Sequence, residues 1–257
     1  MAGARAGRAH APLLLACDLD GTLLDHEGVP VPGAGEAVDD LVRAGVTFAV
    51  VTGRPLASAR RATAALGVDP AVLACYHGAL IADVHGRVLR HLPVPCEPGR
   101  TVIGRALAAG LGVTVWDVDT PRELEPGGAS ADEPGATASR LVLHGDPDVA
   151  GGLLSELRDA WAGRLRVLPI RPGFVGVFAP EVDKGDALRF VAERLGVPPG
   201  RIVACGDGAA DEALLAAADV RVAVGDAPHV LGHVESVVLT DWRRLPRTLE
   251  ALVRPLL

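Results

Sequence analysis

The amino-acid sequence predicts an α/β fold, in which a doubly wound parallel sheet core is interrupted by a smaller inserted α/β domain. Short apolar runs alternate with helical segments over residues 1–85 and again over 183–257, a pattern typical of a parallel sheet covered by helices on both faces. Between them, over 86–182, apolar residues alternate with polar ones instead. The chain has 257 residues, 49% of them hydrophobic, which is enough for one or two packed domains. We therefore expect a Rossmann-like core in two parts, 1–85 and 183–257, separated by an inserted domain at 86–182.

The first part of the core begins with PLLLAC, a continuous apolar run of the kind found in strands buried on both faces. The next segment, GAGEAVDDLVRAG, has apolar residues at helical spacing and stops at Gly45. Two more apolar runs, VTFAVV and AVLACY, flank the segment ASARRATAALG. The expected elements are a strand at 12–17, a helix at 33–45, a strand at 46–51, a helix at 57–67 and a strand at 71–76.

The second part of the core repeats this alternation. GDALRFVAERLG and ADEALLAAA have helical spacing, whereas RIVAC, RVAVG and SVVLT are short apolar runs typical of strands. The chain closes with RLPRTLEALVRPLL, which is expected to be helical. The expected elements are a helix at 185–196, a strand at 201–205, a helix at 210–218, strands at 221–225 and 236–240, and a helix at 244–257.

The inserted domain is predicted from five alternating apolar runs: RVLRHLPV, VTVWDV, RLVLHG, LRVLPI and FVGVFA. Alternation of this kind indicates strands with one buried and one solvated face. Two helices are expected among these strands, near 98–110 and 148–162. Residues 119–139 are acidic and rich in proline and glycine, and we expect an irregular excursion there.

The charge and hydropathy of the chain limit its partners. A net charge of −7 argues against nucleic acid, whose phosphates would be repelled, but a bound cation can invert the local sign for a small phosphorylated substrate. No apolar run approaches the length needed to cross a bilayer. The N-terminus, MAGARAGRAHAPLLLAC, resembles a secretory signal, but its apolar run is short and continues into DLDGT. We therefore expect a buried first strand and no membrane partner.

The four cysteines are Cys17, Cys75, Cys96 and Cys205. Their spacing does not match that of metal ligands. Three of them end apolar runs, so we expect small buried thiols and a location in the reducing cytoplasm.

The first strand is followed by a pair of carboxylates in CDLDGTLLD. Asp18 and Asp20 point the same way in an extended segment, and Gly21 permits a sharp turn. A simple Asp-Gly hairpin turn is an alternative interpretation. A calcium loop is excluded, because Leu23 and Val29 stand where that loop requires glycine and glutamate.

Two further motifs follow predicted strands. In VVTGRP, Thr52 offers a hydroxyl group and Gly53 an accessible amide, although threonine before a glycine turn is ordinary. CGDGAADEALL resembles a dinucleotide-binding loop, but the carboxylates of Asp207 and Asp211 would repel a pyrophosphate. They suit a hard cation such as Mg²⁺, which prefers oxygen ligands.

A fourth motif, KGDAL, contains Lys184, the only lysine among 25 lysine and arginine residues in a chain without asparagine or glutamine. A lysine at a helix start is poorly placed against the helix dipole unless an anion shares the site. Its compact ammonium group fits one phosphoryl oxygen better than a planar guanidinium does. The alternative is a chance surface lysine. Because ligands of open parallel sheets bind beyond the carboxyl ends of the strands, we expect the four motifs to converge there.

Taken together, DLDGTLL, VTGR, KGDAL and GDGAAD, in this order and spacing, resemble the four signature motifs of the haloacid dehalogenase superfamily. The insert resembles the α/β cap of the Cof-type phosphatase branch of that superfamily. The resemblance covers nearly the whole chain and implies a hydrolase of phosphoric monoesters. Each motif is common by itself, but the set is specific.

The resemblance implies a role for each motif residue. Asp18 is the nucleophile that forms an aspartyl-phosphate, and Asp20 is the general acid and base. Neighbouring carboxylates suit these roles, because they push each other's proton affinities apart. Mg²⁺ would be held by Asp18, the main-chain carbonyl of Asp20, Asp207 and Asp211. The phosphoryl group would be held by Thr52, Gly53 and Lys184.

The chain departs from the family pattern at three positions. Relatives commonly carry asparagine where this sequence has His77, Ala210 and Asp226. The missing asparagine side chains would affect the fine arrangement of phosphate and metal. The nucleophile, the acid/base residue and the lysine are retained. His77 can replace an amide contact, but a histidine after a strand is more often a surface group.

We expect a Mg²⁺-dependent phosphatase acting on a small soluble phosphate ester, such as a sugar or polyol phosphate. The cap would close over the core and contribute specificity. Two alternatives are a phosphomutase that uses the same aspartyl-phosphate and a catalytically degenerate phosphate-binding module. Candidates for substrate contact are Arg54, His77 and, in the cap, Trp116, Arg122, Arg140, His144 and Arg171. An exposed structural role is the alternative for each of the five cap residues.

Overall fold

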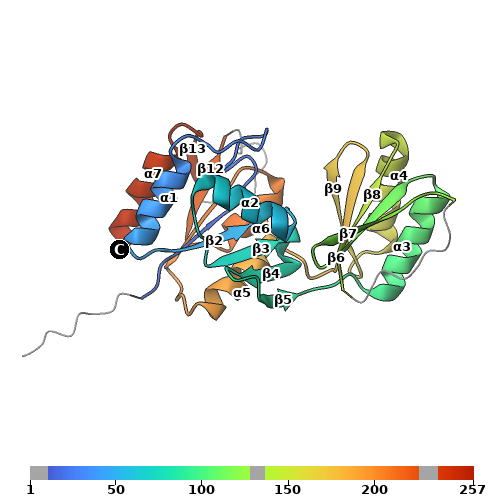
Figure 1. Ribbon diagram of the computed structural model, residues 1–257, viewed down its shortest axis with the longest axis horizontal. Coiled ribbons are helices and arrows are strands. Elements are labelled where there is room, and N and C mark those ends of the chain that lie inside the picture. The colour runs from blue at the N-terminus through green and yellow to red at the C-terminus, as the bar shows by residue number, and fades with distance from the viewer. Residues whose placement is uncertain (1–10, 128–136, 226–236) are drawn as a thin grey trace, which may run out of the picture. The chain divides into compact units, whose positions relative to one another are not determined.

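The computed structural model describes residues 11–127, 137–225 and 237–257 (Figure 1). Within these ranges the chain forms two compact units. The first comprises residues up to 50 together with 62–72 and 188–257, and the second comprises 51–61 and 73–187. The second unit is thus larger than the predicted insert, and the predicted domain boundaries stay a prediction.

The first unit is built on parallel strands. Strand β1 (Leu14–Cys17) has four buried side chains, as its continuous apolar run predicts. It pairs in parallel with β2 (Thr47–Val51) on one side and with β11 (Ile202–Gly206) on the other. From β11, the parallel arrangement continues through β12 (Val220–Val224) and β13 (Val237–Thr240).

Helices α1 (Ala34–Arg43) and α7 (Leu245–Val253) lie side by side in the first unit (Figure 1). The apolar residues of α1 recur every three or four positions, so that one face is buried: Ala34, Ala37, Val38 and Leu41. Where a single helix was predicted at 210–218, the chain forms a 3₁₀ turn, η2 (Ala209–Asp211), and then the short helix α6 (Glu212–Ala216).

The second unit contains two groups of strands. The first group runs through β3 (Val72–Cys75), the 3₁₀ turn η1 (Tyr76–Gly78), β4 (Leu80–Asp83) and β5 (Val88–His91). The second group is an antiparallel sheet of five strands: β6 (Gly112–Asp117), β7 (Thr120–Leu124), β8 (Ala138–His144), β9 (Arg166–Arg171) and β10 (Phe174–Phe178). Hydrogen-bonded neighbours follow the order β13-β12-β11-β1-β2 in the first unit, and β3-β4-β5 and β7-β6-β8-β10-β9 in the second.

Helices α3 (Cys96–Ala108) and α4 (Pro147–Ala160) cover one face of the five-stranded sheet (Figure 1). Their apolar side chains and those of the strands form a common core, which includes Val102, Leu157, Val113 and Leu141. This confirms an α/β layer with one covered sheet face. The remaining helices are α2 (Leu56–Leu66) and α5 (Lys184–Arg194), both close to their predicted positions.

Several expectations for individual elements were wrong. The run at 87–94 was expected in the sheet of the insert, but β5 pairs antiparallel with β4, a strand that was not predicted. Residues 120–124 form β7 within the stretch expected to be irregular, because they pair with β6. Cys17, Cys75 and Cys205 are buried, but Cys96 is exposed at the start of α3. In the part of the chain described here, no helix is long and apolar enough to cross a membrane.

Candidate active site

Three carboxylates cluster in the first unit. Asp18 follows β1, and Asp207 and Asp211 follow β11, the parallel neighbour of β1. The main-chain amide of Asp18 donates to the carbonyl oxygen of Cys205 at 3.0 Å, so both strands end at the same level. One oxygen from each of the three carboxylates lies within 4.8 Å of the others. Asp18 and Asp211 are buried, which concentrates negative charge away from water.

Two glycines permit this close approach. Gly21 has a φ of +73°, which is a left-handed conformation, and a Cβ atom there would overlap the Asp207 carboxylate. A Cβ atom on Gly206 would overlap the side chain of Asp211. The indole Nε1 of Trp242 donates to the carbonyl oxygen of Gly21 at 2.7 Å and so fixes the turn after Asp20. The glycines of the DGT and GDG motifs therefore make room for the carboxylates.

Asp211 also shapes its own loop. Its Oδ2 accepts hydrogen bonds from the main-chain amides of Asp207 at 3.1 Å and Gly208 at 3.2 Å. These bonds satisfy amide groups at the start of the η2 turn and set the direction of Asp207. Asp211 is thus a loop-forming residue as well as a member of the cluster.

The cluster fits a divalent metal ion. All of its donor atoms are carboxylate oxygens, which are the ligands that hard cations such as Mg²⁺ prefer. Asp20 is not one of the three clustered side chains; it is exposed and forms a bridge pair with Leu24. Among the departures from the family pattern, Ala210 is exposed in η2, and Asp226 lies outside the described residues.

The candidates for phosphate binding belong to the second unit. Thr52 is fully buried, and its amide and carbonyl groups bond to Ala74 at 2.8 Å and to His77 at 2.9 Å. A Cβ atom on Gly53 would lie 2.8 Å from His77 Nε2, so only glycine lets the imidazole approach the backbone here. Lys184 is the first residue of α5 and only 2% exposed. It is therefore not a chance surface lysine.

A carboxylate next to Lys184 offsets the positive end of the dipole of helix α5. The preceding Asp183 accepts hydrogen bonds from the amides of Gly185 and Asp186 at 2.9 and 3.1 Å, as an N-cap residue does. Its second oxygen pairs with Arg166 at 3.0 Å. A carboxylate beside the helix start lowers the cost of placing an ammonium group there.

His77 does not behave as a surface histidine, contrary to that expectation. Its ring packs edge-on against Phe178 with 5.4 Å between centroids. Burial, followed by the positive charges of Lys184, Arg140 and Arg166, lowers the pKa of His77 to about 3. The imidazole is therefore neutral at physiological pH, and it can donate from one nitrogen and accept at the other, as an amide side chain does.

Two of the predicted substrate-contact residues meet beside Gly53. The Arg140 guanidinium carbon lies 4.9 Å from the ring centre of Tyr76 and 5.1 Å from that of Trp116. Its NH1 donates to the carbonyl oxygen of Gly53 at 3.3 Å. Arg54 joins the same region through its backbone, because its carbonyl oxygen accepts from the Tyr76 amide at 3.1 Å.

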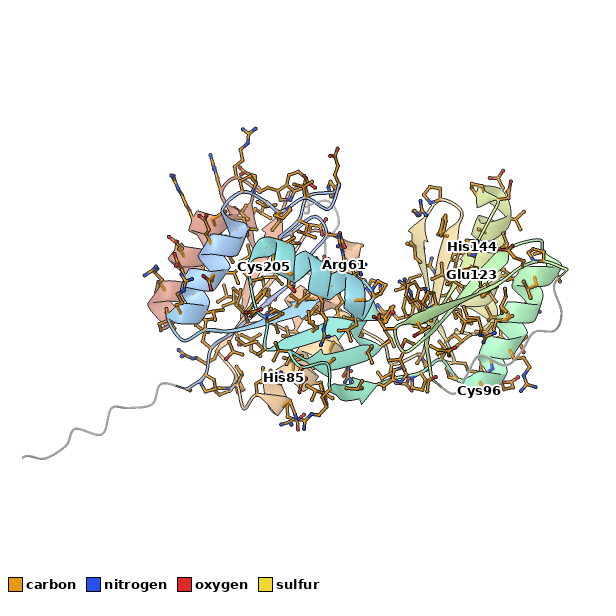
Figure 2. All side chains as sticks on the ribbon, viewed as in Figure 1. Arg61, His85, Cys96, Glu123, His144 and Cys205 are labelled. Atoms are coloured by element: carbon orange, nitrogen blue, oxygen red, sulfur yellow. The ribbon has the colours of Figure 1, made fainter. Side chains whose placement is uncertain are left out.

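The other candidates form separate contacts. The Arg171 guanidinium carbon lies 3.7 Å from the ring centre of Phe174, and His144 stacks on the same ring. His144 also contacts Glu123 at 3.3 Å (Figure 2). His144 is four residues from Arg140 along β8, which corresponds to about 13 Å in an extended strand. Arg122 pairs with Asp117 at 3.9 Å. Arg171 and His144 therefore belong to a different part of the sheet from Arg140 and Trp116.

Sequence reasoning missed Tyr76 and Asp119. Tyr76 OH donates to Asp119 Oδ1 at 2.9 Å, and Asp119 also accepts from the amides of Leu56 and Ala57. Tyr76 is the only tyrosine in the chain, and this was the one available signal. Asp119 falls in the stretch that was expected to be irregular. That the carboxylate cluster and the phosphate-binding candidates act on one phosphate stays a prediction.

The fold and the carboxylate cluster together define a class: doubly wound α/β proteins with a cation-type site at the carboxyl ends of two neighbouring parallel strands. The chain matches the haloacid dehalogenase-like hydrolases over residues 15–103 and 127–241, and it belongs to this family. The resemblance inferred from the four motifs is thereby confirmed, and so is the prediction that the protein is an enzyme of the hydrolase class.

Individual relatives agree with this assignment. A phosphoglycolate phosphatase of Methanopyrus kandleri is 27% identical over 229 residues, covering 88% of this chain and 90% of the relative. The crystal structure of a Thermotoga maritima protein superposes with a TM-score of 0.81 at 20% identity, covering 94% of this chain and 97% of that one. A sugar phosphatase of HAD subclass IIB superposes with a TM-score of 0.76 at 15% identity, covering 95% and 100%. These two structures confirm the predicted α/β fold.

Proposed function

We propose that this protein is a Mg²⁺-dependent phosphatase that hydrolyses a small soluble phosphate monoester through an aspartyl-phosphate. The observation that carries the proposal is the cluster of Asp18, Asp207 and Asp211 at the ends of two adjacent parallel strands. Family membership and a curated relative that is a phosphatase support it. We also propose that the enzyme works in the cytoplasm.

In the first chemical step, a carboxylate oxygen of Asp18 attacks the phosphorus atom of the ester. The bond between phosphorus and the ester oxygen breaks, and Asp20 gives a proton to the leaving alkoxide. Asp20 then accepts a proton from a water molecule that attacks the aspartyl-phosphate. The bond between phosphorus and Asp18 breaks, which releases inorganic phosphate and restores both carboxyl groups to their starting states.

The remaining motif residues hold the phosphoryl group and neutralise its charge. Thr52 would donate its hydroxyl hydrogen, Gly53 its amide hydrogen and Lys184 its ammonium hydrogens. Asp18, Asp207 and the main-chain carbonyl of Asp20 would bind Mg²⁺, with Asp211 in support. When bound, the ion supplies positive charge that offsets the repulsion between the phosphate and the carboxylates.

The substrate we propose is a sugar or polyol phosphate, or another small ester of similar size. Support comes from a structural neighbour that is a sugar phosphatase and a curated relative that acts on phosphoglycolate. A screen of phosphorylated metabolites for phosphate release distinguishes among these esters. A phosphomutase would instead return the phosphate to its product, without net release to water.

The proposal is tested by measuring phosphate release from generic esters with and without Mg²⁺. We expect release that requires Mg²⁺ and is abolished by Asp18→Asn. The matched control is Asp146→Asn, because Asp146 caps α4 in the second unit and has no proposed role in the chemistry. Mg²⁺-independent release, or release that survives Asp18→Asn, would overturn the mechanism.

A further inference from the structure

Backbone strain is concentrated at one place in the described part of the chain. Its non-glycine residues with left-handed backbone conformations are Tyr76, His77 and Val118, with φ values of 51°, 57° and 56°. Such conformations are costly, above all for a β-branched valine, and they tend to persist at functional sites. Tyr76 and Val118 are far apart in sequence, yet both adjoin the carboxylate of Asp119.

Asp119 joins the turn between β6 and β7 to the segment 52–57. Its Oδ1 accepts from the Leu56 amide at 2.7 Å and from Tyr76 OH at 2.9 Å, and its Oδ2 accepts from the Ala57 amide at 2.8 Å. Burial, followed by the hydrogen bond to Asp119, raises the pKa of Tyr76, so its hydroxyl group remains a donor. Asp119 therefore caps helix α2 from a position 63 residues further along the chain.

This distant cap is unlike the caps of α4 and α5. Asp146 and Asp183 cap those helices from the position adjacent to each helix start. A local aspartate is thus enough to satisfy the free amides of a helix in this protein. The cap of α2 comes from another element, so it also ties the start of α2 and the preceding residues to the turn between β6 and β7.

The strained turn that carries Asp119 is held on both sides of Val118. The Val118 amide donates to the carbonyl oxygen of Thr137 at 3.0 Å, and Ser139 Oγ donates to the carbonyl oxygen of Val118 at 2.9 Å. Ser139 is fully buried and lies 3.0 Å from His91 Nε2. The surrounding structure thus forces Val118 into the conformation that presents Asp119.

Arg140 acts on the same segment through one peptide group. Its NH1 donates to the Gly53 carbonyl oxygen at 3.3 Å, and the Arg54 amide of that peptide donates to Thr52 Oγ1 at 3.2 Å. A trans peptide is planar, and its carbonyl and amide groups point in opposite directions. Holding the carbonyl oxygen therefore orients the amide. With Thr52 Oγ1 accepting from that amide, the hydroxyl hydrogen of Thr52 is directed elsewhere.

We propose that Asp119 and Arg140 are positioning residues, which hold the segment 52–57 so that the Thr52 hydroxyl faces the phosphoryl group. This inference rests on the proposed function for its effect on catalysis, but not for its effect on the segment itself. The residues would act through backbone groups of Gly53, Leu56 and Ala57, without touching the substrate.

The first test is amide hydrogen exchange over residues 52–57, which needs no catalysis. In Asp119→Ala and Arg140→Gln we expect exchange in this segment to be about tenfold faster or more, because a capping bond or a peptide anchor is lost. The matched controls are Asp146→Asn, another capping aspartate, and Arg164→Gln, whose guanidinium stacks on Trp161 at 4.7 Å. Both controls should leave the exchange of 52–57 unchanged.

The second test is steady-state kinetics with two esters, p-nitrophenyl phosphate and glycerol phosphate. A misplaced segment should lower kcat by roughly tenfold to a hundredfold, by the same factor for both esters and with a smaller change in KM. Asp119→Asn and Arg140→Lys should recover part of the loss, since an amide oxygen can still accept at residue 119 and an ammonium group can still donate at residue 140. If Asp119→Ala or Arg140→Gln fails to fold, the conservative variants take their place in both tests.

Two outcomes would overturn the proposal. Unchanged exchange of 52–57 in folded Asp119 and Arg140 variants would mean that these residues do not hold the segment. A loss of activity that differs strongly between the two esters would mean that Arg140 contacts the leaving group directly. If the wild-type protein hydrolyses neither ester, the proposed function fails, and the exchange experiment alone still decides whether Asp119 and Arg140 position the segment.

Discussion

The carboxylate cluster of the first unit and the segment 52–57 of the second unit are built in different ways. The cluster comes from two short motifs at the ends of β1 and β11, and glycines within the same motifs make room for it. The segment 52–57 is held by residues far away in sequence, such as Arg140, 87 residues after Gly53. Local motifs can therefore encode a cluster of carboxylates, whereas the conformation of the segment 52–57 depends on long-range contacts.

The sharpest test of the carboxylate cluster, which is encoded by local motifs, is the variant Asp18→Asn. We expect phosphate release to fall by about a thousandfold or more, because the amide cannot act as the nucleophile. Phosphate release from a generic ester, measured beside the Asp146→Asn control, provides the comparison. Substantial activity in Asp18→Asn would mean that the cluster is not where the chemistry occurs.

A second variant tests whether the motif glycines serve the cluster. Gly21→Ala should weaken Mg²⁺ binding by about tenfold or more, because a Cβ atom would displace the Asp207 carboxylate. It should also destabilise the protein by roughly 1 kcal/mol through the left-handed backbone. Gly33→Ala is the matched control, since Gly33 has a φ of +78° and a Cβ atom there would contact only Pro246 at 3.5 Å. Calorimetric Mg²⁺ titration should separate the two variants, and equal affinities would contradict this account.

A variant of Lys184, the only lysine, tests the phosphate-binding candidates of the second unit. Lys184→Arg should lower kcat/KM by about tenfold or more, since a planar guanidinium does not fit the buried space occupied by an ammonium group. Arg194→Lys makes the reverse exchange at an exposed position of the same helix and should have no effect. Near-normal turnover in Lys184→Arg would show that the charge alone matters and that the shape of the group does not.

The last expected effect concerns the pH dependence of stability and involves no catalysis. The pKa of His77 is lowered to about 3 by burial and by Lys184, Arg140 and Arg166, so the unfolded chain binds this proton more readily than the folded protein. The stabilisation is fully present above pH 6.5 and is lost as the pH falls from 6.5 towards 3. Between pH 7 and pH 5, His77 should account for about 2 kcal/mol of lost stability.

Chemical denaturation at pH 7 and pH 5 measures this effect. His77→Asn should reduce the loss of stability between the two pH values, whereas His85→Asn, at an exposed position after β4, should not. An equal loss in wild type and His77→Asn would mean that water reaches the imidazole in the folded protein.

The elements that were predicted well share a physical property. Strands β1, β2, β3 and β11 are continuous apolar runs, and helices α1 and α5 have a regular apolar face, so burial of each segment is visible in its own sequence. Strand β5 was recognised as a strand but assigned to the wrong sheet. Alternation of apolar and polar residues shows that one face of a strand is buried, but it does not show which strand it pairs with. Strand β7 is largely exposed and is defined by its hydrogen bonds to β6.

For the site, the sequence by itself determined the identity and order of the candidate residues, since Asp18, Asp207, Asp211 and Lys184 lie in short motifs attached to recognisable strands and helices. Only the tertiary structure decided that His77 is a partly buried, neutral imidazole and that Asp119 and Arg140 bond to the backbone of the segment 52–57. The reason is physical: side-chain chemistry and local periodicity are properties of neighbouring residues, whereas desolvation and long-range hydrogen bonds arise only when distant segments pack together.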